Sequence, residues 1–359
     1  MGNYIQKFAG LFFASFLLTI SIAIAQTPTF TWMSGDEVWN QGPNNVSIST
    51  GIYGTKTSPA VANVVGSRQG SLSWKDASGN LWLFGGFGRD KNSSNGYMND
   101  LWKYNPTTNL WTWMKGSEFI RQGSVYGTKG TPSLNNTPSA RAYSVTWTDA
   151  NGDLWLFGGY GYDQSGVTLR YLNDLWKYNV STNQWTWMSG SDVANRIGIY
   201  GTKGTAASDN VPGSRQYSVS WADANGNLWL FGGTGFDKNG AQGHLNDLWK
   251  YNIASNKWTW VSGSDRIYQN VFQNNVYGTK GTPSINNIPS ARYSSVSWVD
   301  ANGNLMLFGG YGTDKNGSWG SLNDLWRFNS TSSEWTWVSG SDIVNQVGIY
   351  GTKGTASAN

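Results

Sequence analysis

The sequence predicts an all-β protein built from four copies of one sheet-forming unit, and three observations lead to this fold class. Strand and turn formers dominate the composition: 22 Trp and 46 Gly stand against only three Glu in 359 residues, which disfavours helices. The same motifs return every 73 to 77 residues, measured between the arginines that open each copy. Within each copy, four short apolar and aromatic runs alternate with turn residues, as expected of four consecutive strands.

The N-terminal 25 residues have the features of a secretory signal peptide. Lys7 is the only charged residue before Asp36, an apolar run covers residues 8–24, and Ala23-Ile24-Ala25 forms a small-residue cleavage site. The alternative, a membrane anchor, is less favoured because the run is shorter than the ~20 residues that a helix needs to cross a bilayer. We expect export to a secreted, cell-surface or periplasmic location, and no membrane span after the signal is removed.

Residues 26–67 hold a lone outer strand followed by an insertion. The motif Phe30-Thr31-Trp32 matches the last strand of each later copy, and Tyr53 begins a Tyr-Gly-Thr-Lys motif that also follows each copy. The four copies that come next are expected at residues 68–116, 141–190, 215–263 and 292–340.

The second copy illustrates the predicted strands. A tight Asn-Gly hairpin joins the first strand to the second, and a polar turn joins the third to the fourth. Gly158 and Gly159 end the second strand, and we expect a positive φ or a close backbone approach there. The four strands are predicted at residues 144–147, 154–157, 174–178 and 185–188.

Such a four-stranded meander carries aromatic residues on both faces, so a single copy cannot bury its apolar surface alone. Neighbouring sheets must pack face to face, as the blades of a β-propeller do. The paired tryptophans of the fourth strand, such as Trp185 and Trp187, are therefore predicted to lie in the core between blades.

These motifs resemble the kelch repeat: paired glycines after the second strand, an aromatic residue in the third and a Trp in the fourth. The resemblance covers residues 68–340 and extends to the central propeller of galactose oxidase. The chain departs from the family pattern in the added segments of 24 to 28 residues that follow each of the first three copies. The copper site of galactose oxidase is excluded, because that chemistry needs a Cys and several His, whereas this chain has no Cys and one His.

The C-terminal residues 341–359 match the start of another added segment. Four whole blades and one lone strand would leave sheet edges exposed, which natural proteins avoid. We therefore expect an incomplete propeller, a chain that stops before its closing blade. A monodisperse, protease-resistant monomer would count against this expectation.

The loop face is the expected place of function, because the loops between the second and third strands and the added segments emerge there together. Family resemblance implies that arginines opening the inner strand grip acidic groups, which would suit a carboxylate-bearing sugar or peptide. The alternative is a structural arginine that bonds loop carbonyls or the Asp of Asn-Asp-Leu-Trp. Recurrence in every copy favours the structural role for these residues: Arg68, Arg141, Arg215 and Arg292.

Aromatic residues on the same loops are candidates for stacking on sugar rings. Packing between these loops and the added segments is an equally good explanation. The residues are Phe87, Tyr160, Tyr162, Phe236, Tyr311 and Trp319.

The added segments share a Tyr-Gly-Thr-Lys-Gly core that is too regular for a disordered linker. We expect each tyrosine (Tyr126, Tyr200, Tyr277) to anchor against the loop between the second and third strands of an adjoining blade. The lysines would then lie at the rim, either binding an acidic partner or belonging to a clasp between blades. These lysines are Lys129, Lys203 and Lys280.

The remaining site chemistry is sparse. The Asp-Lys-Asn loop tips hint at calcium, but hard cations need several carboxylates and no lysine among them, so no metal or cofactor is expected. His244 is expected on a surface loop, and no catalytic residue stands out. A net charge of +4 is too small for a nucleic-acid binder. The sequence favours a secreted, non-enzymatic module that binds a protein or glycan; the alternative is an extracellular carbohydrate-active enzyme such as a sugar mutarotase, epimerase or lyase.

Overall fold

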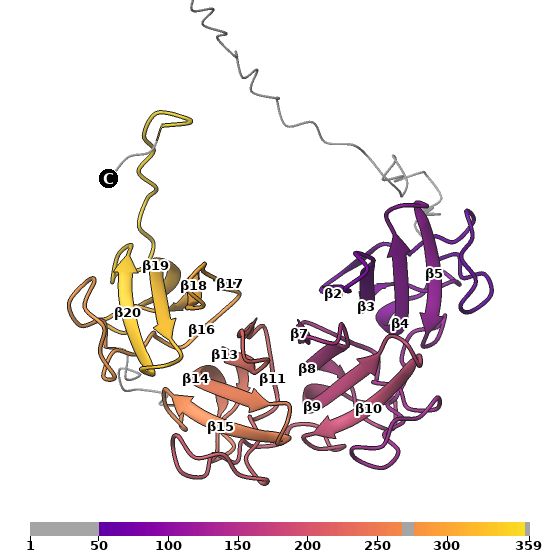
Figure 1. Cartoon of the computed structure of the whole chain (residues 1–359), viewed down its shortest axis with the longest axis horizontal. Helices are drawn as coiled ribbons and strands as arrows, with labels where there is room; N and C mark the ends of the chain where they lie inside the picture. The colour runs from indigo at the N-terminus through magenta and orange to yellow at the C-terminus, as the bar shows by residue number, and fades with distance from the viewer. Residues whose placement is uncertain (1–49, 268–275, 356–359) are drawn as a thin grey trace, which may run out of the picture. The chain divides into compact units, whose positions relative to one another are not determined.

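The computed structural model describes residues 50–267 and 276–355. The predicted signal peptide and the lone strand at residues 30–35 lie outside these residues. Within them the secondary structure consists of strands and turns, and no helix is long and apolar enough to span a bilayer. The strands form four antiparallel sheets, one for each predicted copy, which Figure 1 shows in chain order from indigo to yellow. We call them blades 1 to 4.

The strands follow one another in sequence order. Blade 1 contains β1 (Arg68–Gln69), β2 (Leu72–Lys75), β3 (Leu81–Arg89), β4 (Asn95–Asn105) and β5 (Leu110–Lys115). Blade 2 contains β6 (Arg141–Ala142), β7 (Val145–Thr148), β8 (Leu154–Tyr162), β9 (Leu169–Asn179) and β10 (Gln184–Ser189). Blade 3 contains β11 (Arg215–Gln216), β12 (Val219–Ala222), β13 (Leu228–Phe236), β14 (Gln242–Asn252) and β15 (Lys257–Ser262). Blade 4 contains β16 (Arg292–Tyr293), β17 (Val296–Val299), β18 (Leu305–Thr313), β19 (Trp319–Asn329) and β20 (Glu334–Ser339).

Each blade has four strand positions, and its innermost position is divided between two short strands. In blade 2, β6 and β7 both pair with β8, and Tyr143 between them has a φ of 61°. This conformation turns the Tyr143 amide toward blade 1, where it donates to the carbonyl of Gly70 at 3.0 Å. The same bond recurs from Tyr217 to Tyr143 and from Ser294 to Tyr217. The left-handed residues therefore link the inner strands of consecutive blades.

The loops between the second and third strands are shorter than the sequence suggested. In blade 2 the ladder between β8 and β9 continues as far as Tyr162 and Leu169, so only residues 163–168 form the turn. Most residues assigned to a long loop are thus strand residues near the end of a hairpin. The aspartates at these tips close the turn: Asp90 Oδ1 accepts the amides of Asn92 and Ser94, both at 2.9 Å.

The paired glycines have the predicted backbone. Gly158 and Gly159 have φ values of 66° and 98°, and a bulge interrupts the β8–β9 ladder between Phe157 and Gly159. A Cβ atom on Gly158 would lie 2.8 Å from the carbonyl oxygen of Arg215 in blade 3. Glycine is therefore required both by the conformation and by the close approach of the next blade.

Apolar side chains from two consecutive blades form each core cluster. The trailing face of blade 1, which we define by Leu72, Trp74 and Phe84, packs against the leading face of blade 2. We define this leading face by Leu154, Leu156, Tyr178 and Trp185, all of which are buried. Trp185 lies in this core and Trp187 packs on its margin, as predicted.

A polar contact fixes the register of each pair of faces. The indole of Trp74 donates to the carbonyl of Trp155 at 2.9 Å, Trp147 donates to Trp229, and Trp221 donates to Met306. Burying large rings around a satisfied indole stabilises neighbouring blades against separation.

Candidate functional site

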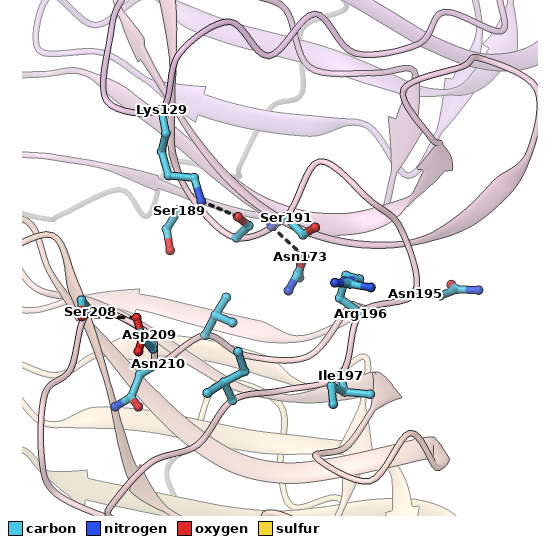
Figure 2. Close-up of a pocket in the computed structure, with 13 residues that line it drawn as sticks. Lys129, Asn173, Ser189, Ser191, Asn195, Arg196, Ile197, Ser208, Asp209 and Asn210 are labelled. Atoms are coloured by element: carbon cyan, nitrogen blue, oxygen red, sulfur yellow. Dashed lines mark hydrogen bonds between the residues drawn. The ribbon is translucent and has the colours of Figure 1, made fainter.

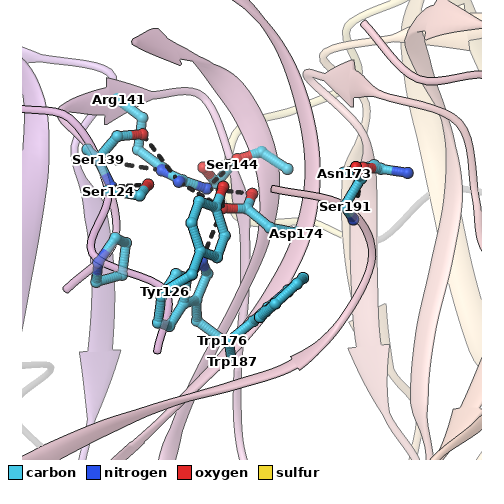
Figure 3. A network of polar contacts seen from close by, with 12 residues as sticks. Ser124, Tyr126, Ser139, Arg141, Ser144, Asn173, Asp174, Trp176, Trp187 and Ser191 are labelled. Carbon is cyan, nitrogen blue, oxygen red and sulfur yellow. Dashed lines mark hydrogen bonds and ion pairs between the residues drawn. The ribbon is translucent and has the colours of Figure 1, made fainter. Parts of the chain in front are cut away.

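The predicted site arginines lie inside the blades. The side chain of Arg141 is fully buried and forms two bonds to Asp174, at 2.6 and 2.7 Å. Arg141 also donates to the carbonyl oxygens of Ser139 and Gly158. Figure 3 shows this network between the end of the inner strand and the third strand of blade 2. The planar guanidinium matches the carboxylate with two parallel bonds, which is the strong form of this pairing.

All four repeats contain this network. Arg68, Arg215 and Arg292 form the same bidentate pairs with Asp100, Asp247 and Asp324. The guanidinium groups are buried and face the carboxylates of Asn-Asp-Leu-Trp. These are the contacts of the structural alternative, and they leave no open guanidinium face for an acidic ligand. We therefore place the four arginines in the framework of the blades and outside the candidate binding surface.

A tyrosine from each added segment completes the network. The Tyr126 hydroxyl donates to Asp174 at 2.9 Å, and its ring packs on Trp176 and Trp187. The sequence placed this tyrosine against the loop between the second and third strands; the structure places it against the third strand itself, β9. The adjoining blade is the next one in the chain, so each added segment spans two consecutive blades.

Burial raises the pKa of the Tyr126 and Tyr200 hydroxyls well above the usual value of 10, and the neighbouring carboxylate adds to the effect. We expect this arrangement to make the protein sensitive to alkali. The unfolded tyrosines ionise above about pH 10, whereas the folded ones resist ionisation. The stability they contribute is fully present below pH 10 and is lost as the pH rises further.

Urea unfolding at pH 8 and at pH 11 measures this loss. Tyr126→Phe should reduce the dependence of stability on pH, because it removes one hydroxyl whose pKa is raised by folding. Equal stability of the wild-type protein at both pH values would contradict the assignment.

The three predicted rim lysines are held by the following blade. Lys129 donates to the carbonyl of Gly190 at 2.9 Å, and its ammonium lies 4.2 Å from the ring centre of Trp187. Lys203 and Lys280 repeat both contacts, with Gly263 and Trp260 and with Gly340 and Trp337. These contacts are those of a clasp between blades.

We expect Lys→Ala at Lys129, Lys203 and Lys280 together to lower the melting temperature and leave ligand binding unchanged. Each cation–π contact contributes about 0.5–1 kcal/mol at such partly exposed sites. Lys353→Ala is the matched control, because Lys353 lies in the same motif beside an exposed tyrosine. Weaker, less salt-dependent binding at unchanged stability would instead indicate an acidic partner.

A cavity of about 590 Å³ lies between two added segments and the end of β10. Lys129, Arg196 and Asp209 line it together with Ser189 and Ser191, as Figure 2 shows. A second cavity of about 490 Å³ occupies the equivalent place one repeat earlier, with Lys56 in the position of Lys129. Because the hollow recurs with the repeat, it follows from the way the segments cross the blades and is not specific to one ligand.

The positions that differ among the repeats identify a better candidate site. On a scaffold of nearly identical blades, residues that change from copy to copy are the ones free to serve a ligand. Aromatic residues fill many of these positions near the inner strands and at the ends of the second and third strands. We call this set the aromatic cluster: Phe87, Tyr97, Tyr143, Tyr160, Tyr162, Tyr171, Tyr217, Phe236, His244, Tyr293, Tyr311 and Trp319.

The first half of the cluster runs across blades 1 to 3. Tyr97 contacts Tyr160 and Tyr162 at ring-centre distances of 6.0 and 6.4 Å. Tyr160 contacts Tyr171, which contacts Phe236 of blade 3 at 5.9 Å. Most of these contacts are edge-to-face, a favourable arrangement for aromatic pairs.

The second half follows the inner strands of blades 2 to 4. The ring centres of Tyr143 and Tyr217 lie 4.4 Å apart, and those of Tyr217 and Tyr293 lie 6.1 Å apart. His244 stacks on Tyr293 at 4.9 Å and contacts Trp319 at 4.8 Å.

Several phenols of the cluster keep their protons at neutral pH. Burial, reinforced by neighbouring tyrosines, raises the pKa of Tyr97 and of Tyr217 to about 12. Tyr143 contributes to both shifts. Protonated phenols can both donate and accept hydrogen bonds beside an apolar ring. The cluster therefore offers half-buried stacking surfaces with polar edges.

The structure brings all six predicted loop aromatics into this cluster, with Tyr311 and Trp319 the most exposed of them. Sequence reasoning missed Tyr97, Tyr143, Tyr171, Tyr217 and Tyr293. These tyrosines lie just after the opening arginine or just before Asn-Asp-Leu-Trp, at positions where the four copies carry different residues. That variation between copies was the signal that could have found them.

The surface-loop placement of His244 was wrong. His244 belongs to β14, where it pairs with Thr234 in the ladder and lies 2.9 Å from the Thr234 hydroxyl. Burial lowers its pKa below the usual 6.5, so it is neutral at pH 7. No group of three or more His, Asp or Glu side chains in residues 50–267 and 276–355 is placed to hold a metal ion.

Comparison with known proteins supports the relation suggested by the repeated motifs. Kelch domain-containing protein 10 of Homo sapiens is 23% identical over 298 residues, which cover 71% of this chain and 57% of that protein. The repeats are similar to those of kelch proteins. N-acetylneuraminate epimerase of Shigella boydii is 26% identical over 172 residues, 42% of this chain and 44% of that protein. N-acetylneuraminate epimerase 2 of Escherichia coli matches to the same extent.

These matches between kelch repeats span about half of the length of the relatives. No protein-family model matches the chain. The relatives share the blade architecture with this chain, and at these identities the ligand-facing positions must be judged from its own residues.

Proposed function

We propose that this chain is a non-enzymatic kelch module that binds glycans through the aromatic cluster. The observation that carries the proposal is the concentration of aromatic residues from all four blades at positions that vary between otherwise matching repeats. The framework arginines, anchoring tyrosines and clasp lysines recur in the repeats and are occupied by protein contacts. The cluster is the part of the described chain that the repeat itself does not explain.

The chemistry of the cluster suits sugars. The apolar face of a pyranose stacks on aromatic rings, and phenol hydroxyls bond the sugar hydroxyls at its edge. Rings that already pack against one another lose little freedom on binding, which favours affinity. Export of the chain, expected from its N-terminal residues, would expose such a surface to extracellular glycans.

Tyr217→Gly is the sharpest test. Gly70 occupies the equivalent place in blade 1, and Tyr217 itself has a φ of 57°, so glycine fits the backbone there. The variant should keep its melting temperature within a few degrees. It should bind glycans selected on an array about tenfold more weakly, the loss expected when one stacking contact of ~1.4 kcal/mol is removed.

Tyr350→Gly, which alters an exposed tyrosine outside the cluster, is the control and should bind like the wild-type protein. Unchanged binding by Tyr217→Gly, or no glycan binding by the wild-type protein on the array, would count against the proposal.

A sugar epimerase or mutarotase is the second candidate, favoured by the relatives named N-acetylneuraminate epimerase. Neutral His244, in contact with Tyr293 and Trp319, is the cluster residue best suited to move a proton. Nuclear magnetic resonance of N-acetylneuraminate and of N-acetylhexosamines can follow turnover directly. Turnover that His244→Asn abolishes would replace the binding proposal with this one.

A further inference from the structure

Blade 4 exposes the surface that the first three blades bury. At the trailing face of blade 3, Val219, Trp221 and Phe231 are each less than 9% exposed. The equivalent residues of blade 4 are Val296, Trp298 and Phe308, which are 60%, 43% and 42% exposed. An apolar face of this kind, rigid and shaped to receive another sheet, is a recognised mark of an interaction site.

Blade 1 exposes part of the complementary surface. Leu154, Leu228 and Leu305 lie on the leading faces of blades 2 to 4 and are fully buried. Their equivalent in blade 1, Leu81, is 45% exposed. Apolar side chains are thus exposed at both ends of the four described blades.

The polar groups at the two ends are complementary as well. In the three internal interfaces the indole of the trailing face donates to the carbonyl of a β-strand residue on the leading face. Trp298 holds the equivalent indole at the end of blade 4, and Trp82 holds the equivalent carbonyl in blade 1. A contact of blade 4 with blade 1 would repeat the bond already formed three times within the chain.

From this we infer that the trailing face of blade 4 binds the leading face of blade 1 in a second copy of the chain. The contact is head-to-tail, so it joins two different surfaces, and a closed ring of copies satisfies every face. Two copies supply eight blades, four from each chain, within the four to eight blades typical of propellers.

The contact uses the sheet faces alone. Tyr53 already occupies the tyrosine position of blade 1, where its hydroxyl donates to Asp100 at 2.7 Å. Tyr350 of the other copy therefore cannot take this position, and the proposed contact does not depend on Tyr350.

Light scattering of the purified chain across a concentration series tests the proposal. The wild-type protein should have twice the mass of one chain. Val296→Asp on the trailing face and Leu81→Asp on the leading face should each weaken association by about tenfold or more, because each buries an unpaired carboxylate in the contact. Both residues are exposed within one chain, so each variant should fold. Val61→Asp, at another exposed apolar residue, should remain a dimer.

Mixing distinguishes this assembly from others. Val296→Asp chains keep a sound leading face and Leu81→Asp chains keep a sound trailing face, so an equimolar mixture should form dimers at concentrations where each variant alone is monomeric. A monomeric wild-type protein would overturn the inference, whether its faces bind each other within one chain or are covered by other residues of that chain. Dissociation by Val296→Asp but not by Leu81→Asp would also overturn it, because it would indicate two trailing faces in contact.

Discussion

Gly158→Val is expected to unfold blade 2 or to lower its melting temperature by more than any other single change considered above. Valine would have to adopt a φ of 66°, a conformation that costs a β-branched residue about 1–3 kcal/mol. Its Cβ would also lie 2.8 Å from the carbonyl oxygen of Arg215 and 2.9 Å from that of Leu172. Both carbonyls belong to strand backbone, so neither can move without shifting a sheet. Overpacking of this kind adds a further 1–3 kcal/mol, roughly.

Gly226→Val separates the two causes. Gly226 has a φ of 76° but no atom lies within 4 Å of the position of its Cβ. It should therefore show only the conformational cost, measured as the difference in melting temperature by calorimetry. Equal losses at the two positions would mean that the close approach of blades 2 and 3 contributes nothing.

Asp174→Asn should cost about 3–5 kcal/mol, the range for removing one partner of a buried ion pair. Asp174 accepts two bonds from Arg141, one from Tyr126 and one from Trp176. Asparagine keeps the shape but leaves the fully buried guanidinium without a compensating charge. Urea unfolding of the variant against the wild-type protein measures the difference in free energy.

The double variant Arg141→Met, Asp174→Leu provides the informative comparison. Replacing both charges with apolar groups of similar volume is often close to neutral. The double variant still leaves the buried Tyr126 hydroxyl and Trp176 indole without an acceptor, so it should recover only part of the loss. Asp192→Asn, at an exposed aspartate, should have little effect. A small loss in Asp174→Asn would show that the network contributes little to holding the added segment on the blade.

The loop aromatics show how far sequence reasoning reached into the candidate site. It selected Tyr160, Tyr311 and Trp319 because they lie on the predicted loops between the second and third strands, where aromatic rings could stack on sugars. It did not select Tyr143 or Tyr217, because nothing local distinguishes a tyrosine beside an inner strand from one in the core. Their contact depends on two blades whose tyrosines are 74 residues apart in the chain.

The sequence by itself determined the four repeats, the order of the strands within each, the positive φ of the paired glycines and the placement of the strand tryptophans between blades. These features are periodic or local, so composition and spacing express them directly. Only the tertiary structure decided that Arg141 faces Asp174, that Lys129 clasps the next blade and that Trp298 remains uncovered. Each of these depends on which surface meets a given side chain across a blade boundary. An arginine at a strand opening can face a ligand or a carboxylate with the same residue pattern, and only the packing of the sheets selects one.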